Sequence, residues 1–159
     1  FQMSSVEFFR LVKDHLREDG VMVVNMNMMG GGAGSINEYL SDTIANVFPE
    51  VYIVDVPHAT NAELFASRNT ALLEQFTRNT SLEQDPEIKD LMADVSENLK
   101  HYVGGNHIMT DDKAPIEVLG MKMIDQLISD ELEYYRGEFE TYKKIFREEG
   151  FKGLMNALQ

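Results

Sequence analysis

Apolar residues recur at helical spacing in four parts of the chain. Near its start, Val6, Phe9, Val12 and Leu16 are separated by three or four residues, which places them on one face of a helix. A serine before this run can cap the first turn. The predicted helices span residues 5–16, 36–47, 86–102 and 118 to about 149, and the polar stretch 77–85 predicts a connector before the third of them.

Short continuous apolar runs predict the strands. The run Val21–Val24 follows an Asp-Gly turn and is rich in β-branched residues, as expected of a strand buried on both faces. Two further runs, 51–56 and 62–67, are joined by only five residues. Because so short a connection cannot form a parallel crossover, these runs predict an antiparallel hairpin. The predicted strands are 21–25, 51–56 and 62–67.

Together these elements predict an α/β fold whose mixed sheet ends in an antiparallel hairpin, followed by a helical C-terminal region. We expect residues 1–76 to form the α/β domain. Residues 77–159 should form a helical region packed on that domain, with a loop at 110–117. A chain of 159 residues with 43% apolar side chains can bury one ordinary core.

Composition and charge restrict the classes of function. The net charge of −13 argues against a nucleic-acid partner, because phosphate backbones are bound by clustered Lys and Arg. An acidic surface attracts polycationic amines, but it also serves solubility alone, so charge selects no substrate. The sequence has no cysteine and no apolar run of about 20 residues. We therefore expect a cytoplasmic chain without disulfides, thiolate metal sites or a membrane span.

The glycine cluster from Gly30 to Gly34 allows two interpretations. Its G-x-G-x-G pattern lies after a predicted strand and before a predicted helix, and Asp55 ends the next strand. This arrangement is typical of loops that bind a nucleotide or an S-adenosyl cofactor. However, the cluster is separated loosely from the preceding strand and lies close to a hairpin. The alternative is a glycine-rich connection that binds no ligand.

Three carboxylates in the loop 110–117 are the candidate substrate-binding residues: Asp111, Asp112 and Glu117. Such a cluster can bind an amine, or a hard cation such as Mg²⁺ through oxygen ligands. The alternative is structural, because aspartates hydrogen-bond the backbone of turns and a glutamate can cap the following helix. The histidines lack the i, i+4 spacing of a helical metal pair, so the sequence predicts no metal site.

Several segments carry motifs in an order that is typical of one family. S-V-E-F-F at 5–9 and L-R-E-D-G-V-M-V-V-N at 16–25 are similar to the family patterns T/S-x-E-F-F and L-x-P/D-G-G-V-x-V-x-N. N-A-E-L-F-A-S at 61–67 resembles a later strand of the same fold, and M-T-D-D-K-A-P-I-E at 109–117 is similar to the signature L-T-D-D-x-A-P-V-E. From residue 1 to about 135, the chain thus resembles spermidine-synthase-like proteins of the polyamine aminopropyltransferase family.

The resemblance implies the C-terminal half of a Rossmann-like methyltransferase fold. It also implies transfer of an aminopropyl group to an amine, with decarboxylated S-adenosylmethionine as the cosubstrate of the whole protein. In that family the cosubstrate loop, the ribose-binding acid and the catalytic aspartate lie upstream, which implies that they precede Phe1. We therefore expect no catalytic residue and no cofactor in this chain, which should be inactive by itself. The alternative is a noncatalytic binding or assembly module that keeps the fold.

The last predicted helix carries a second pattern. Its apolar residues from Ile128 to Phe146 alternate spacings of four and three, a narrow seam like that of a coiled coil. The seam is either an internal packing face or a contact with a second chain, and the edge of the strand 21–25 offers another contact. We therefore expect a homodimer. For the whole protein, the resemblance implies a polyamine or another small amine as the small-molecule partner.

Overall fold

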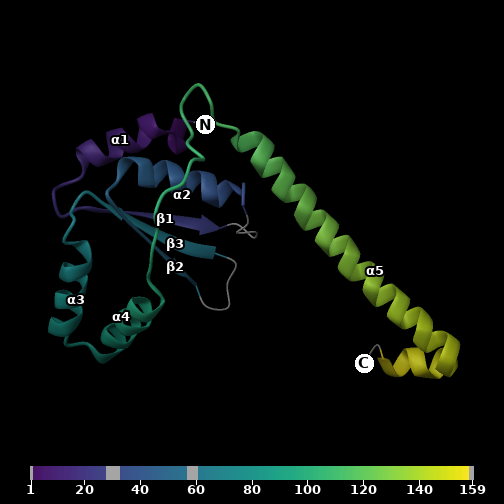
Figure 1. Cartoon of the computed structure of the whole chain (residues 1–159). Helices are drawn as coiled ribbons and strands as arrows, with labels where there is room; N and C mark the ends of the chain where they lie inside the picture. The colour runs from purple at the N-terminus through teal and green to yellow at the C-terminus, as the bar shows by residue number, and fades with distance from the viewer. Residues whose placement is uncertain (1, 28–32, 57–60, 158–159) are drawn as a thin grey trace. The chain divides into compact units, whose positions relative to one another are not determined.

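The computed structural model describes residues 2–27, 33–56 and 61–157. The chain divides into two compact units, Phe1–Leu119 and Gly120–Gln159. The first unit combines a sheet with short helices, and the second is helical (Figure 1). The expected α/β class is confirmed.

Serine and aspartate caps start three helices of the first unit where the sequence predicts them. Ser5 accepts a hydrogen bond from the Phe8 N–H and Ser35 accepts one from the Glu38 N–H, both at 3.2 Å, while Asp85 caps a third helix. These side chains satisfy amide donors that the first helical turn leaves free. The helical segments are a 3-10 turn (Gln2–Ser4), α1 (Val6–His15), α2 (Ile36–Val47), α3 (Leu72–Leu82) and α4 (Pro86–Asn98).

The described strands form one sheet in the order β1-β3-β2-β4. The predicted hairpin of β2 and β3 is confirmed, with Tyr52 opposite Phe65, and β1 pairs with the other side of β3 through Val23 opposite Phe65. Every pairing between the described strands is antiparallel, so the parallel part of a mixed sheet is not among them. The strands are β1 (Val21–Asn27), β2 (Glu50–Asp55), β3 (Asn61–Ser67) and β4 (Lys100–His101).

Different pairs of helices lie beside the two faces of the sheet (Figure 1). On the α1–α2 side, Met26, Val51 and Leu64 of the strands pack in one buried cluster with Ile44 of α2 and Phe48 at its end. Successive strand residues point to opposite faces, so this cluster takes alternate positions of each strand. It is the hydrophobic core of the first unit, and it fixes α2 against the sheet.

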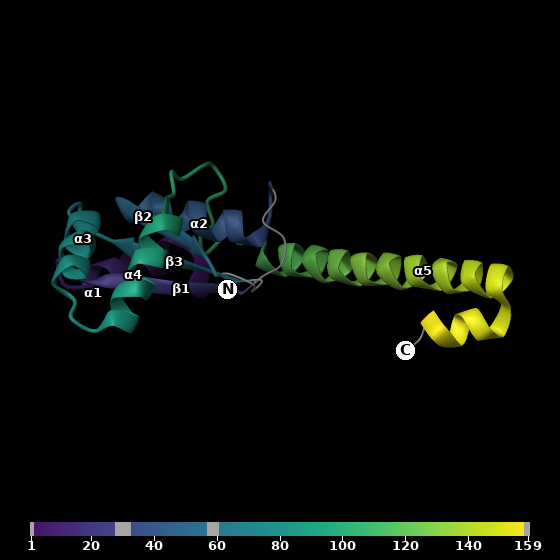
Figure 2. The same cartoon turned by 90° about the horizontal axis from the view of Figure 1, so that it is seen from below.

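The opposite face of the sheet is covered less completely. On this side α4 lies across the strands in the view from below (Figure 2). Together α3 and α4 leave an apolar hollow of about 320 Å³, which Val21, Val23 and Phe65 line from the strands. Leu72 and Phe76 of α3 line it from the helical side. The two valines of β1 remain exposed, because β1 has a paired neighbour only on its β3 side among the described strands.

The prediction of a connector at 77–85 is wrong for most of that stretch. α3 continues to Leu82, and only three residues then separate it from α4. Leu72 and Phe76 anchor the first turns of α3 against the sheet, and a nucleated helix propagates at little further cost. The Thr80 hydroxyl adds a hydrogen bond to the Phe76 carbonyl within the helix. Polar composition alone therefore gave the wrong secondary structure.

The predicted helix over 86–102 is wrong at its end. α4 stops at Asn98, and Lys100–His101 pairs with β2 instead. The Tyr102 N–H then donates to the Val51 carbonyl at 2.9 Å. Hydrogen bonds that an existing strand edge offers thus outweigh the local preference for helix.

The second unit contains most of α5 (Ile116–Ala157). The predicted helix from 118 to about 149 is confirmed, and α5 extends it in both directions. At Gly150, φ is 67°, a left-handed conformation that favours glycine and separates the long run from a second helical segment. Within the described ranges, no helix is both long and apolar enough to cross a membrane.

Candidate functional site

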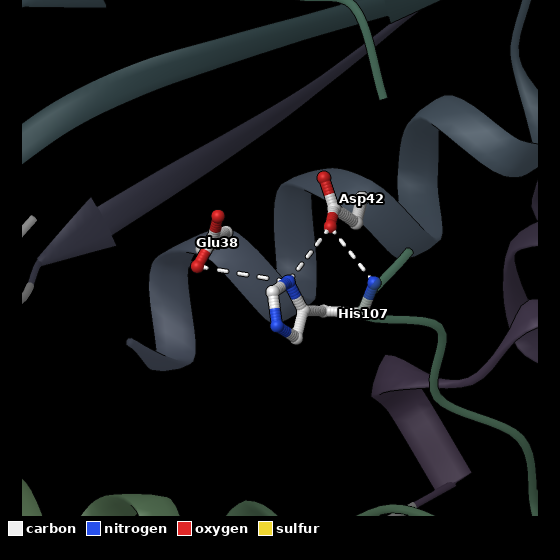
Figure 3. Close-up of side chains that lie close together, drawn as sticks. All are labelled: Glu38, Asp42 and His107. Carbon is white, nitrogen blue, oxygen red and sulfur yellow. Dashed lines mark hydrogen bonds and ion pairs between the residues drawn. The ribbon is translucent and has the colours of Figure 1, made fainter. Parts of the chain in front are cut away.

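A face of α2 and a distant segment meet at three ionisable side chains. Glu38 and Asp42 are four residues apart in α2, so both lie on the same side of that helix. His107 belongs to the segment 102–109, which follows β4, and its ring lies beside both carboxylates (Figure 3). Ligand atoms of the three side chains all lie within 4.8 Å of one another.

The Asp42 carboxylate is the centre of this cluster, and its side chain is only 1% exposed. Its Oδ1 accepts hydrogen bonds from the Tyr102 hydroxyl and the Gly105 N–H, each at 2.7 Å. Its Oδ2 accepts one from the His107 N–H at 2.9 Å and lies 3.2 Å from His107 Nδ1. One buried side chain thus fastens a segment that lies 60 to 65 residues further along the chain. We call these contacts the Asp42 clamp.

Two glycines let the 102–109 segment approach α2 closely. A Cβ at Gly105 would lie 2.8 Å from Asp42 Oδ2, and one at Gly104 would lie 2.8 Å from the Ala45 Cβ. Side chains do not tolerate such distances, so the clamp requires glycine at both positions. The glycines therefore serve close packing here.

The clamp changes the proton affinity of its members. Burial by itself raises the pKa of Asp42, but hydrogen bonds from Tyr102, His107 and Gly105 favour the charged form and outweigh burial. The pKa of Asp42 is therefore below its ordinary value of 3.8. Burial, followed by the hydrogen bond to Asp42, raises the pKa of Tyr102. At neutral pH, Asp42 is an anion and Tyr102 is a neutral donor.

His107 is the accessible member of the cluster. Its side chain is 38% exposed, and its ring centroid lies 4.6 Å from that of Tyr39. Its Nδ1 also lies 3.6 Å from Glu38 Oε2, and that oxygen accepts a hydrogen bond from the Gly34 N–H. A histidine whose Nδ1–H points to a carboxylate keeps Nε2 as an acceptor. The arrangement can therefore orient an imidazole for proton transfer or for contact with a ligand.

The same cluster offers an imidazole nitrogen and two carboxylates, a donor set that divalent metal ions accept. However, each oxygen of Asp42 already has two hydrogen-bonding neighbours. A metal ion would have to displace these donors from a buried site, which costs the free energy of the clamp. The geometry fits a hydrogen-bonded clamp better than a metal centre, and we assign no metal to it.

Among the predicted substrate-binding residues, Asp111 has a structural role. Its carboxylate accepts a hydrogen bond from the Ser5 hydroxyl at 2.5 Å, and its N–H donates to Glu7 Oε2 at 3.1 Å. The Val6 N–H also donates to the Met109 carbonyl at 2.9 Å. These contacts fasten the start of the loop 110–117 to the N-terminus of α1, which is the structural alternative that the sequence left open.

The other two predicted substrate-binding residues are exposed. Asp112 lies in the turn closed by the bridge between Thr110 and Lys113, and Glu117 lies in the first turn of α5. Within the described part of the chain, neither side chain makes a hydrogen bond or an ion pair. Both carboxylates are therefore accessible, and their role in binding a substrate stays a prediction.

The glycine cluster falls mostly outside the described residues, which include only Gly34 of its glycines. Gly34 has φ 76°, and its N–H donates to the carboxylate of Glu38 in the first turn of α2. Asp55, the acidic residue of the ligand-loop interpretation, forms an exposed ion pair with Lys100 at 2.5 Å.

Sequence reasoning missed the Asp42 clamp. The local signal was the i, i+4 pair of Glu38 and Asp42, but such pairs also occur on ordinary solvated helices. Asp42 and His107 are 65 residues apart, a separation that periodicity cannot reveal. The histidines lack helical metal spacing, and His107 contacts Asp42 only through the tertiary fold.

No family model matches the sequence of the chain. Over its whole length, the chain is 44% identical to a probable polyamine aminopropyl transferase of Bifidobacterium longum, and it spans 38% of the length of that relative. The resemblance predicted from the motifs is thereby confirmed: over its whole length, the chain is similar to a protein named as a probable polyamine aminopropyl transferase.

Proposed function

We propose that the protein to which this chain belongs transfers an aminopropyl group from an S-adenosyl-type cosubstrate to an amine. The observation that carries this proposal is the 44% identity, over the whole chain, to a relative whose name describes that activity. The motif at 109–117 supports it, because the loop keeps both exposed carboxylates and the aspartate that fastens it.

In this reaction the amine nitrogen attacks the carbon beside the sulfonium sulfur. A new N–C bond forms, the C–S bond breaks, and its electron pair returns to sulfur, which leaves a neutral thioether. The attacking amine loses a proton, which a positioned carboxylate can accept as general base. The resemblance implies that this carboxylate belongs to the rest of the protein. We therefore assign structural and substrate-contact roles to the residues described here.

The sheet topology supports a ligand-facing edge. β1 and β2 both run antiparallel to β3, so their C-terminal ends lie at the same edge of the sheet. In open, mostly parallel α/β sheets, which the resemblance implies for the whole protein, ligands bind outside the carboxyl ends of strands. At this edge the Asn61 amide donates to Asn25 Oδ1 at 3.4 Å. We place the substrate side of the whole protein at this edge.

We assign Asp112 and Glu117 to the amine. A polyamine is a cation at neutral pH, and exposed carboxylates attract it at modest energy. Asp111 supports them indirectly, because its hydrogen bond with Ser5 fixes the loop that carries Asp112. This division explains how one loop can contain both a structural aspartate and substrate-facing carboxylates.

An aminopropyl-transfer assay of the full-length protein tests the proposal. Mass spectrometry should detect the amine with one added aminopropyl group. The double variant Asp112→Asn, Glu117→Gln should raise KM for the amine about tenfold and change kcat by less than about twofold, because two screened charge contacts are lost. The control Glu87→Gln, which removes an exposed carboxylate from α4, should leave KM unchanged.

The outcomes distinguish an error in the proposed activity from an error in the proposed amine site. Normal turnover with an unchanged KM in the double variant would show that the amine does not bind at this loop. Absence of turnover with every amine would contradict the activity and favour a noncatalytic binding or assembly module. One observation favours that second candidate, since Asp42 and Asp111 bind groups of the chain itself.

Calorimetry with methylthioadenosine tests the role of this part of the protein. Residues 1–159 alone should show no micromolar binding, because the resemblance implies that the cosubstrate loop belongs to the rest of the protein. Micromolar binding would overturn that assignment and would support the glycine cluster as a ligand loop. The full-length protein is the positive control.

A further inference from the structure

α5 carries large apolar side chains that its own unit leaves uncovered. Tyr142 is half-buried, beside a hollow that is also lined by Ala157 in the segment after Gly150. The other members of the stripe are each more than half exposed: Ile128, Leu132, Tyr135, Phe139 and Phe146. Contiguous exposed apolar side chains are unfavourable in water and mark contact surfaces. We call these six residues the α5 seam.

The spacing of the α5 seam is that of a two-stranded coiled coil. Its intervals are four, three, four, three and four residues. In heptad notation the first residue of the seam is a d position, and the a and d positions then alternate. Charged residues stand at the next positions of the pattern, Asp125 before the seam and Glu149 after it. The uninterrupted apolar pattern therefore runs from Ile128 to Phe146.

The charges beside the seam distinguish between the two orientations of a helix pair. Glu131 and Glu138 occupy the g positions on one side, and Arg136 and Lys143 occupy e positions on the other. In a parallel, in-register pair, each g position faces the e position five residues later on the partner helix. Glu131 then faces the partner's Arg136, and Glu138 faces the partner's Lys143. In an antiparallel pair, g faces g and e faces e, so charges of like sign meet.

We propose that α5 pairs with α5 of a second copy of this chain as a parallel, in-register coiled coil. The contacts that these charged groups make within one helix are compatible with this pairing. Lys143 lies 3.1 Å from Glu140, and the Tyr134 hydroxyl lies 3.2 Å from Glu138. These exposed contacts contribute little free energy and can be exchanged for contacts with the partner. The proposal is independent of the activity proposed above.

Light scattering on the full 159-residue chain at tens of micromolar tests the pairing. The expected mass is twice the monomer mass of 18.1 kDa. Phe139→Glu should raise the dimer dissociation constant by at least about a hundredfold, because it places a charge in the centre of the apolar interface. A monomeric wild type overturns the proposal. A dimer that Phe139→Glu leaves unchanged also overturns it, and would indicate an interface at the exposed valines of β1.

Charge reversal tests the orientation. Glu131→Lys should weaken the dimer about tenfold, because the new positive charge repels the partner's Arg136, and this repulsion occurs twice in the symmetric pair. Adding Arg136→Glu should restore affinity to within about threefold of wild type, since both pairs are then reversed together. Failure of this rescue contradicts the parallel register. Circular dichroism at each step shows whether helix content is preserved.

A single cysteine gives an independent test of register, because the chain has none of its own. In a parallel, in-register pair, Tyr135→Cys brings two thiols together at a d position, and mild oxidation should link most of the protein. Lys144→Cys, at the outer f position, is the matched control and should link far less. Equal linking of the two variants, or none in either, contradicts the proposed geometry.

Discussion

The first unit and α5 differ in which side chains they bury. In the first unit the charged side chain of Asp42 is buried, and the chain supplies all its hydrogen-bond donors. In α5 the seam residues are apolar, yet most of them are exposed. The first unit is thus stabilised by contacts within one chain, whereas the second unit leaves the apolar face of α5 uncovered, the face for which we propose a partner helix.

This difference makes separate experiments possible. A change in the Asp42 clamp should alter the free energy of unfolding of the first unit without altering the association of α5. A change in the α5 seam should do the reverse. Contacts of distant, independent sites contribute additively to stability, so a variant that changes both properties would contradict the separation.

Asp42→Asn should have the largest effect on the first unit. An amide in place of the carboxylate turns one acceptor oxygen into a donor, so donors of the 102–109 segment face another donor in a buried place. We expect the free energy of unfolding to fall by about 3 kcal/mol at neutral pH. Urea unfolding followed by circular dichroism measures it. A loss below about 0.5 kcal/mol would show that the clamp is not important for stability.

The same variant predicts a pH dependence with a defined sign. Because the pKa of Asp42 is lower in the folded chain, its stabilising contribution is complete above the unfolded value of 3.8. That contribution is lost as the pH falls through the lower, folded pKa. The difference between wild type and Asp42→Asn should therefore be largest near neutral pH and shrink below pH 3.8. A difference that stays constant in acid contradicts the assignment.

Gly105→Ala should have the next largest effect. Its Cβ would lie 2.8 Å from Asp42 Oδ2, so the segment must move away and lengthen its hydrogen bonds. We expect a loss of about 2 kcal/mol in urea unfolding. Gly137→Ala is the matched control, because an added Cβ there meets no atom within 4 Å. It should stabilise α5 by up to about 1 kcal/mol, a change of opposite sign.

Tyr102→Phe should have the smallest effect of the three. It removes one of the hydrogen bonds to Asp42 and leaves the ring in place, so we expect a loss of about 1 kcal/mol. The pKa of Asp42 should rise, because the hydroxyl is among the groups that lower it. NMR titration of the carboxyl carbon measures this shift. An unchanged pKa would show that the backbone N–H groups alone hold the anion.

Much of the fold follows from local sequence, because helices and tight turns depend on neighbouring residues. Ser5 caps α1 as the sequence predicts, α2 begins at the predicted residue, and the short connection after β2 requires the observed hairpin. The motif at 109–117 indicated the resemblance to polyamine aminopropyl transferases, and a relative of that name is 44% identical to the chain. The candidate site was predicted only in part, since Asp111 could be identified as a turn residue, but its partner Ser5 lies 106 residues away.

Other features depend on the tertiary structure alone. Lys100–His101 becomes a strand because β2 offers it an unpaired edge. Asp42 becomes a buried anion because the segment 102–109 packs against α2 and supplies hydrogen-bond donors to its carboxylate. Such contacts join residues far apart in sequence, so neither propensity nor spacing contains them. By itself, the sequence determined the serine cap of the first helix, the hairpin, the motifs of the resemblance and the heptad seam, which are short-range patterns. The tertiary structure decided which polar groups are buried, because desolvation and hydrogen bonding depend on neighbours that only folding brings together.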